Sequence, residues 1–190
     1  MNDQSDPQNE LSRVLKKICE IAEKSADGDY IFRGETELHE EKPYYGTVSS
    51  NLCREYLDDI EEESFEIEFV QEEILDEAKK YSDKEDFEIL TELQHYGSKT
   101  NLIDFTTDYL IALFFACDGS TRKDGRVILQ KRSSVESFLE HPREPRNRVM
   151  AQKSIFVRPP RGYIKPDVVV TIESYLKQPI LVVCHNYLDS

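Results

Sequence analysis

Hydrophobic residues gather most densely between residues 91 and 119, in the segment TELQHYGSKTNLIDFTTDYLIALFFACDG. Residues 110–117 are apolar without a polar side, so a helix here is expected to be buried all round. The run is too short to span a bilayer, which takes about 20 apolar residues. Thr106 and Asp108 are typical N-cap residues, and Gly119 is a typical stop. The pattern predicts a central core helix that starts near Thr106.

The rest of the first half has the pattern of helices separated by short breaks. Apolar residues recur at helical spacing among charged ones, which is typical of helices that bury one face. A short strand is expected at residues 30–34 and a short strand or turn within residues 43–50, and the polar residues 1–9 are expected to be disordered. The expected helices span residues 10–24, 49–59, 61–80 and 86–96.

Strand-like runs dominate after Gly119. Strands are expected at residues 125–130, 154–157, 168–172 and 179–184, with short helical segments or turns at 133–139 and 174–177. Helices before strands predict an α+β fold, with a helix-rich N-terminal half around the buried central helix. A small mixed or antiparallel sheet would come mostly from the C-terminal half. Residues 10–190 are expected to form a single domain.

The net charge of the chain makes some classes of function less expected. Asp and Glu total 38 against 24 Lys and Arg, which gives a formal charge of −14. Non-specific nucleic-acid binding is disfavoured because it depends on Lys and Arg neutralising phosphates, although the basic residues between Arg143 and Lys165 leave a local basic face open. The N-terminal residues have no signal-peptide or anchor pattern. We therefore expect a cytoplasmic protein without a membrane partner.

Metal and hydrolase motifs are not found in the sequence. The four cysteines are widely spaced and fit free thiols in a reducing compartment. No two of the four histidines are spaced for joint ligation on one element, so no metal is expected. Neither a Gly-x-Ser-x-Gly element nor a phosphate-loop motif is present.

A cluster of polar and aromatic residues lies directly before the predicted core helix. His95 and Tyr96 precede Gly97, which permits close approach of the backbone. The N-terminus of a buried helix favours anionic ligands through its dipole. Asp104 is then either a helix cap or buried hydrogen-bonding group, or a part of a binding site.

Arg33 lies at the end of the first predicted strand, next to Gly34. A planar guanidinium there suits a phosphate or carboxylate that approaches the backbone. The alternative is an arginine paired with one of the many carboxylates of this acidic chain.

Five segments in this order resemble the FRG domain, a family named after its Phe-Arg-Gly motif. The resemblance runs from about Asp29 to Val157 and is expected to continue to the C-terminus. The chain departs from the family pattern at Asn101, where the family usually has arginine, and at Phe105, where it usually has tryptophan. The segments are YIFRGE (30–35), LQHYG (93–97), T-x-LIDFT (100–106), ALFFAC (112–117) and R-x-x-AQKSIF (148–156).

The order of these motifs is similar to that of ADP-ribosyltransferase-like proteins, which implies NAD as the substrate. Under this resemblance Arg33 would hold the pyrophosphate or ribose, and His95 and Tyr96 would line the nicotinamide. The glutamate expected two residues after Gln152 is replaced by Ser154, so Asp104 or Glu35 would supply the carboxylate. The implied catalytic residues are Asp104, His95 and Gln152, and the implied ligand-binding residues are Arg33, Gly34, Tyr96, Thr100, Thr106 and Arg148.

Three hypotheses follow. The first is an NAD-dependent ADP-ribosyltransferase or NAD glycohydrolase that acts as a toxin or phage-defence effector, with a protein or nucleic-acid acceptor. The second is a non-enzymatic module that binds a nucleotide, a nucleic acid or a protein through the same cleft. In the third, the polar cluster only caps and hydrogen-bonds the core helix.

Overall fold

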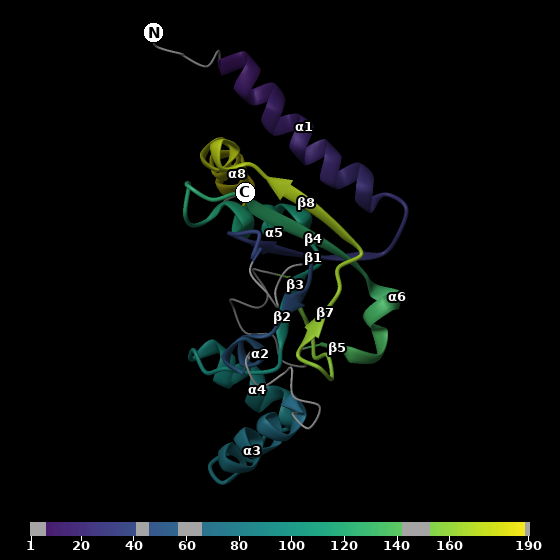
Figure 1. Ribbon diagram of the computed structural model, residues 1–190, viewed down its shortest axis with the longest axis vertical. Helices are drawn as coiled ribbons and strands as arrows, with labels where there is room; N and C mark the ends of the chain where they lie inside the picture. Colours follow the sequence, from purple (N-terminus) through teal and green to yellow (C-terminus); the bar gives the residue numbers. More distant parts are fainter. Residues whose placement is uncertain (1–6, 41–45, 57–65, 142–152, 189–190) are drawn as a thin grey trace. The chain divides into compact units, whose positions relative to one another are not determined.

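The computed structural model describes residues 7–40, 46–56, 66–141 and 153–188 (Figure 1). The chain divides into two compact units. Unit 1 comprises Met1–His39, Thr106–Ser134 and Asp167–Ser190, and unit 2 comprises Glu40–Phe105 and Val135–Pro166. The predicted α+β class is confirmed by helices combined with antiparallel strand pairs. The expected single domain from residue 10 to 190 stays a prediction.

Unit 1 is built on antiparallel strands with the longest one at their centre. The strands are β1 (Tyr30–Glu35), β4 (Gly125–Lys131) and β8 (Val168–Ile172), together with the end of β3 (Ile103–Thr106). Strand β4 pairs with β1 on one side and with β8 on the other. Thr106, the last residue of β3, pairs with Phe32 of β1.

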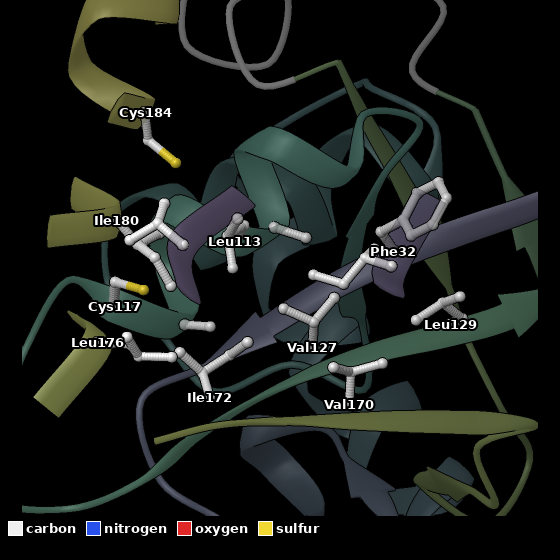
Figure 2. Packing of buried hydrophobic residues seen from close by; sticks show 14 residues of the cluster. Phe32, Leu113, Cys117, Val127, Leu129, Val170, Ile172, Leu176, Ile180 and Cys184 are labelled. Atoms are coloured by element: carbon white, nitrogen blue, oxygen red, sulfur yellow. The ribbon is translucent and has the colours of Figure 1, made fainter. Parts of the chain in front are cut away.

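Three helices cover one face of this sheet. They are α1 (Pro7–Ser25), α5 (Tyr109–Cys117) and α8 (Lys177–Leu188). Helix α5 packs on β1 and β4, and α8 packs on α5 (Figure 1). Figure 2 shows the resulting core, in which Leu113 and Cys117 of α5 lie near Ile180 and Cys184 of α8. Phe32, Val127, Leu129, Val170 and Ile172 are the strand residues of this core.

Helix α5 is the predicted core helix, but it begins later than expected. Each of its residues is buried or half-buried, as an all-round apolar run requires. The chain before it is strand β3, and the helix starts at Tyr109 rather than near Thr106. Asp108 is the N-cap, because its Oδ1 accepts from the backbone N–H of Leu110 at 2.9 Å. Pairing with Phe32 holds Thr106 in the strand, so the helix cannot begin there.

Two other predictions in unit 1 were wrong. Residues 179–184 were expected to form a strand, but they lie within α8. Buried Ile180 and Cys184 are four residues apart, with exposed Val182 between them, which is a helical pattern hidden in a short apolar run. Helix α1 begins at Pro7, so residues 7–9 are helical rather than disordered.

A buried lysine joins two loops of unit 1. Lys177, the first residue of α8, is fully buried, and its ammonium donates to the carbonyl oxygens of Thr36 at 2.7 Å and Ser120 at 2.9 Å. Burial lowers the pKa of Lys177. The side chain therefore ties the segment after β1 to the segment after α5.

Unit 2 has its own helices, strands and core. Leu75, Ile89, Leu90, Leu102 and Phe156 form the buried cluster between its helices and strand β6. The parts of the expected helices 49–59 and 61–80 that fall at 57–65 lie outside the described residues. The elements are β2 (Val48–Ser49), α2 (Asn51–Glu55), α3 (Ile67–Lys79), α4 (Asp86–His95), β5 (Leu139–Glu140), β6 (Ser154–Val157) and β7 (Tyr163–Ile164).

Most other element predictions are confirmed to within a residue or two. The expected helix 86–96 and strands 30–34, 125–130, 154–157 and 168–172 match α4, β1, β4, β6 and β8. The short helices are α6 (Arg132–Val135) and the 3-10 turns η1 (Glu136–Phe138) and η2 (Ser174–Leu176). Within the described ranges, no helix combines the length and apolarity that a membrane crossing requires.

Gly34→Ala tests the contact between β1 and α5. A Cβ at this position would lie 1.8 Å from the carbonyl oxygen of Ala112 and 2.6 Å from the backbone nitrogen of Ala116. Because neither backbone atom can rotate away, we expect unfolding free energy to fall by about 3 kcal/mol. Gly28→Ala is the control, since the atoms nearest to its Cβ belong to the Tyr30 side chain, the closest at 3.0 Å. Equal urea midpoints for the two variants would contradict this packing.

Cysteine alkylation tests the burial of three thiols. Burial raises the pKa of Cys53 to about 11, of Cys117 to about 12 and of Cys184 to about 11, whereas Cys19 is exposed. Because the thiolate is the nucleophile, we expect iodoacetamide to add once to the native protein and four times after unfolding. Intact-mass measurement would show this, and Cys19→Ser should remove the native adduct. A second rapid native adduct would contradict the packing of the two cores.

Candidate functional site

Arg33 lies on the face of the unit 1 sheet that is opposite to α5. Its Nε donates to Oε1 of Glu35 at 3.0 Å. Arg126 of β4 is paired with Glu35 in the strand register. Its Nε donates to Oε2 of Glu35 at 2.7 Å, and its Nη2 lies 2.6 Å from the same oxygen. The exposed fractions of the side chains are 18% for Arg33, 4% for Glu35 and 5% for Arg126. We call these three residues the guanidinium cluster.

Glu35 acts in this cluster as an anion that orders two cations. Burial by itself would raise its pKa, but the charges and hydrogen bonds of Arg33 and Arg126 outweigh burial and hold the pKa below the ordinary value of 4.5. His39 is also near, with Nε2 at 4.0 Å from Oε2 of Glu35. Since each carboxylate oxygen already accepts from a guanidinium, Glu35 is poorly suited to contact a reacting sugar.

Gly34 and Thr106 lie on the other face of the sheet. Side chains alternate along a strand, so both residues share the face of Phe32 rather than that of Arg33. Gly34 faces α5, and the Thr106 hydroxyl oxygen accepts from the backbone N–H of Asp108 at 3.1 Å. Both residues thus have packing and turn roles that explain them, and their ligand-binding roles stay predictions.

In unit 2 a chain of hydrogen bonds ends on Asp104. The Thr100 hydroxyl donates to Oε1 of Gln94, and Nε2 of Gln94 donates to Oδ2 of Asp104 at 2.7 Å. Thr100 is buried, whereas the carboxylate of Asp104 is exposed. We call this chain the Thr100–Gln94–Asp104 network. It connects an exposed acid to a buried anchor through one amide.

Two aromatic side chains lie next to this network in the sequence. His95 is the last residue of α4 and Tyr96 is its C-cap, and their rings meet edge to face with centroids 5.3 Å apart. His95 is exposed, and Tyr96 is 79% exposed. Large exposed aromatic surface of this kind can stack on a planar ligand.

The interpretation of Asp104 as a helix cap was wrong. Asp104 lies within β3, and the cap of α5 is Asp108. Gln94 and Arg126, which are partners of predicted site residues, were not predicted from the sequence. Gln94 stands within the quoted LQHYG segment, and Arg126 is a lone charge in the apolar run of β4, so each had a weak signal.

Asn101, where the family usually has arginine, is a buried anchor in this protein. Its side chain is 1% exposed, its Nδ2 donates to the carbonyl oxygen of Pro159 at 2.9 Å, and its backbone N–H donates to Oε1 of Gln71 at 2.6 Å. A Cβ on Gly162 would approach Oδ1 of Asn101 to 3.3 Å. The residue joins three segments of unit 2.

The predicted site residues fall into separate groups. Arg33 belongs to unit 1, whereas His95, Tyr96, Thr100 and Asp104 belong to unit 2. Convergence of these groups on one cleft therefore stays a prediction. Arg148 and Gln152 lie outside the described residues. In the part of the chain that the structure describes, no group of three or more His, Cys, Asp or Glu residues is arranged to hold a metal ion.

Comparison with known families agrees with the motif order. The sequence profile of the FRG domain matches residues 28–125, just over half of the chain. The chain belongs to the FRG domain family. The match contains the first four resembling segments, and the fifth, at 148–156, lies beyond it. Neither the curated proteins nor the solved structures gave a significant match.

Acid titration of stability tests the guanidinium cluster. Because the folded-state pKa of Glu35 is lowered, its pairing stabilises the fold fully above pH 4.5, and this stabilisation is lost as the pH falls through the lowered value. We expect Glu35→Gln to lower the unfolding free energy by about 3 kcal/mol at pH 7, with a difference that shrinks below pH 4.5. Urea unfolding at successive pH values measures both.

The control for this titration is Glu37→Gln. Glu37 lies in the same segment and pairs with Lys123 at 2.7 Å, but it is on the surface, so we expect little change. Equal losses in the two variants, or a Glu35→Gln difference that does not depend on pH, would contradict the pairing described for Glu35.

Proposed function

We propose that this FRG domain binds NAD and cleaves the bond between nicotinamide and ribose, passing the ADP-ribose group to an acceptor or to water, with Asp104 as the carboxylate that faces the reacting ribose. The observation that carries the proposal is the Thr100–Gln94–Asp104 network. It provides an exposed carboxylate whose Oδ2 is held by an amide, and that amide is itself held by a buried hydroxyl. A site that is fixed before the ligand arrives loses less on binding.

The chemistry needs an ionised and oriented acid. When the bond between nicotinamide and ribose breaks, its electron pair leaves with the nicotinamide and positive charge develops on the ribose. A carboxylate stabilises that oxocarbenium-like state. An acceptor, either water or a group on a protein or nucleic acid, then bonds to the ribose carbon and loses a proton. The hydrogen bond from Gln94 holds Oδ2 of Asp104 in one orientation, as this step requires.

Other residues take the binding roles that the family resemblance implies. The guanidinium of Arg33 suits the pyrophosphate, because a planar fork of N–H groups matches phosphate oxygens. The exposed rings of His95 and Tyr96 suit the nicotinamide. Asp104 is the better of the two carboxylates considered, since both oxygens of Glu35 already accept from arginines.

A binding module without catalysis is the second candidate function. It is favoured by Ser154, which starts β6 at the position where the resemblance to ADP-ribosyltransferase-like proteins implies a catalytic glutamate. The same residues would then hold a nucleotide, or a nucleic-acid or protein partner, without breaking the glycosidic bond. A toxin or phage-defence role belongs to the catalytic candidate, because it would follow from NAD loss or from modification of an acceptor.

Nicotinamide release tests the proposal. Purified protein is incubated with NAD, with and without protein and nucleic-acid acceptors, and free nicotinamide is measured. We expect release that Asp104→Asn slows about 100-fold, as the loss of one transition-state contact does. Asp83→Asn is the matched control, because it makes the same chemical change at an exposed acid of unit 2. Its rate should equal that of the unsubstituted protein.

The outcomes separate the candidates. Release that is equal in the unsubstituted protein and Asp104→Asn would overturn the role of Asp104. NAD binding seen by calorimetry without any release would select the binding module. Absence of both binding and release would overturn the proposal.

A further inference from the structure

Two residues of the guanidinium cluster, Glu35 and Arg126, have no part in ligand binding under the proposed function. We propose that they are positioning residues, which set the direction of the Arg33 guanidinium for recognition of a pyrophosphate. This inference rests on the proposed function, since the pyrophosphate is that of NAD or ADP-ribose.

The geometry attaches Arg33 directly to Glu35. Its Nε donates to Oε1 of Glu35, and the residues are two apart on one face of β1. A bond at Nε fixes the plane of the guanidinium relative to the strand, because the five N–H groups form a rigid fork. An arginine side chain that is ordered before the ligand arrives loses less rotamer entropy on binding.

Arg126 fixes the carboxylate from the other side. Its Nε and Nη2 both contact Oε2 of Glu35, whereas Oε1 accepts from Arg33. The strand register holds Arg126 opposite Glu35, and both side chains are buried. Exposure differs within the cluster, because Glu35 and Arg126 are almost fully buried whereas Arg33 is 18% exposed.

Arg126 also reduces an electrostatic conflict. Glu35 by itself would repel a phosphate that approaches Arg33, since like charges disfavour each other at short range. The positive charge of Arg126, which is in direct contact with the carboxylate of Glu35, offsets that repulsion. Arg33 can therefore be oriented by an acid and still attract an anion.

A double-mutant cycle tests this inference. Calorimetry gives the affinity for ADP-ribose of the unsubstituted protein, Arg33→Ala, Glu35→Gln and the double variant. We expect each single substitution to weaken binding roughly tenfold, as loss of a charged hydrogen bond does. The double variant should bind no more weakly than Arg33→Ala, because Glu35 acts only through Arg33. In turnover, Glu35→Gln should raise KM and leave kcat unchanged.

Each outcome decides a separate point. If the two effects multiply, Glu35 is only a structural residue and the inference fails while the proposed function stands. If Arg33→Ala binds ADP-ribose normally, both the inference and the role of Arg33 in the proposed function fail. Absence of binding by the unsubstituted protein overturns both as well.

A second variant covers loss of folding. Glu35→Asp keeps the charge between the two arginines but withdraws the carboxylate by one methylene. If Glu35→Gln unfolds, the same cycle is measured with Arg33→Ala and Glu35→Asp, with the same non-additive result expected. Normal ADP-ribose affinity in folded Glu35→Asp, or effects that multiply in its double variant, would overturn the inference.

Discussion

Direct contact between the backbone of α5 and strands β1 and β4 is the constraint on which the rest of unit 1 depends. Glycines make it possible, since a Cβ at Gly34 or Gly125 would overlap the carbonyl oxygens of Ala112 or Ala116. The contact buries one sheet face under α5 and α8. Because side chains alternate along a strand, the charged residues Arg33 and Glu35 of β1 and Arg126 of β4 lie on the opposite face of the sheet.

The division between the faces explains why the guanidinium cluster exists. Glu35 and Arg126 are buried charges and Arg33 is partly buried, and charges are tolerated in such places when they are paired and hydrogen-bonded. The same pairing that removes the cost of burial also holds Arg33 in one direction. The Thr100–Gln94–Asp104 network of unit 2 is built in a similar way, except that the groups that orient the acid are neutral. The buried hydroxyl of Thr100 holds the amide of Gln94, which in turn holds the exposed carboxylate of Asp104. In both units, a partly exposed polar group is oriented by a more deeply buried one.

Some elements of this fold could be predicted from the sequence, and others could not. The buried helix at 109–117 and the strands at 30–35 and 125–131 follow from long apolar runs and local breaks, so they were predictable. The helix at 177–188 was not, because its short apolar run fits a strand equally well and packing on α5 decides the matter. Asp104 and Asp108 are both reasonable caps by type. The pairing of Thr106 with Phe32 is what leaves Asp104 in a strand and gives the cap to Asp108.

The sequence by itself determined the FRG family, the α+β class and the identity of the residues worth examining, because motif order and hydrophobic periodicity are properties of the chain alone. It also marked Arg33 and Asp104 as candidates. Only the tertiary structure decided their partners. Strand register brings Arg126 against Glu35, the partner of Arg33, although 91 positions separate Glu35 from Arg126 in the sequence, and chain reversal brings Gln94 to Asp104. Such contacts depend on which face each residue occupies, and periodicity cannot assign a face until the packing partner is known.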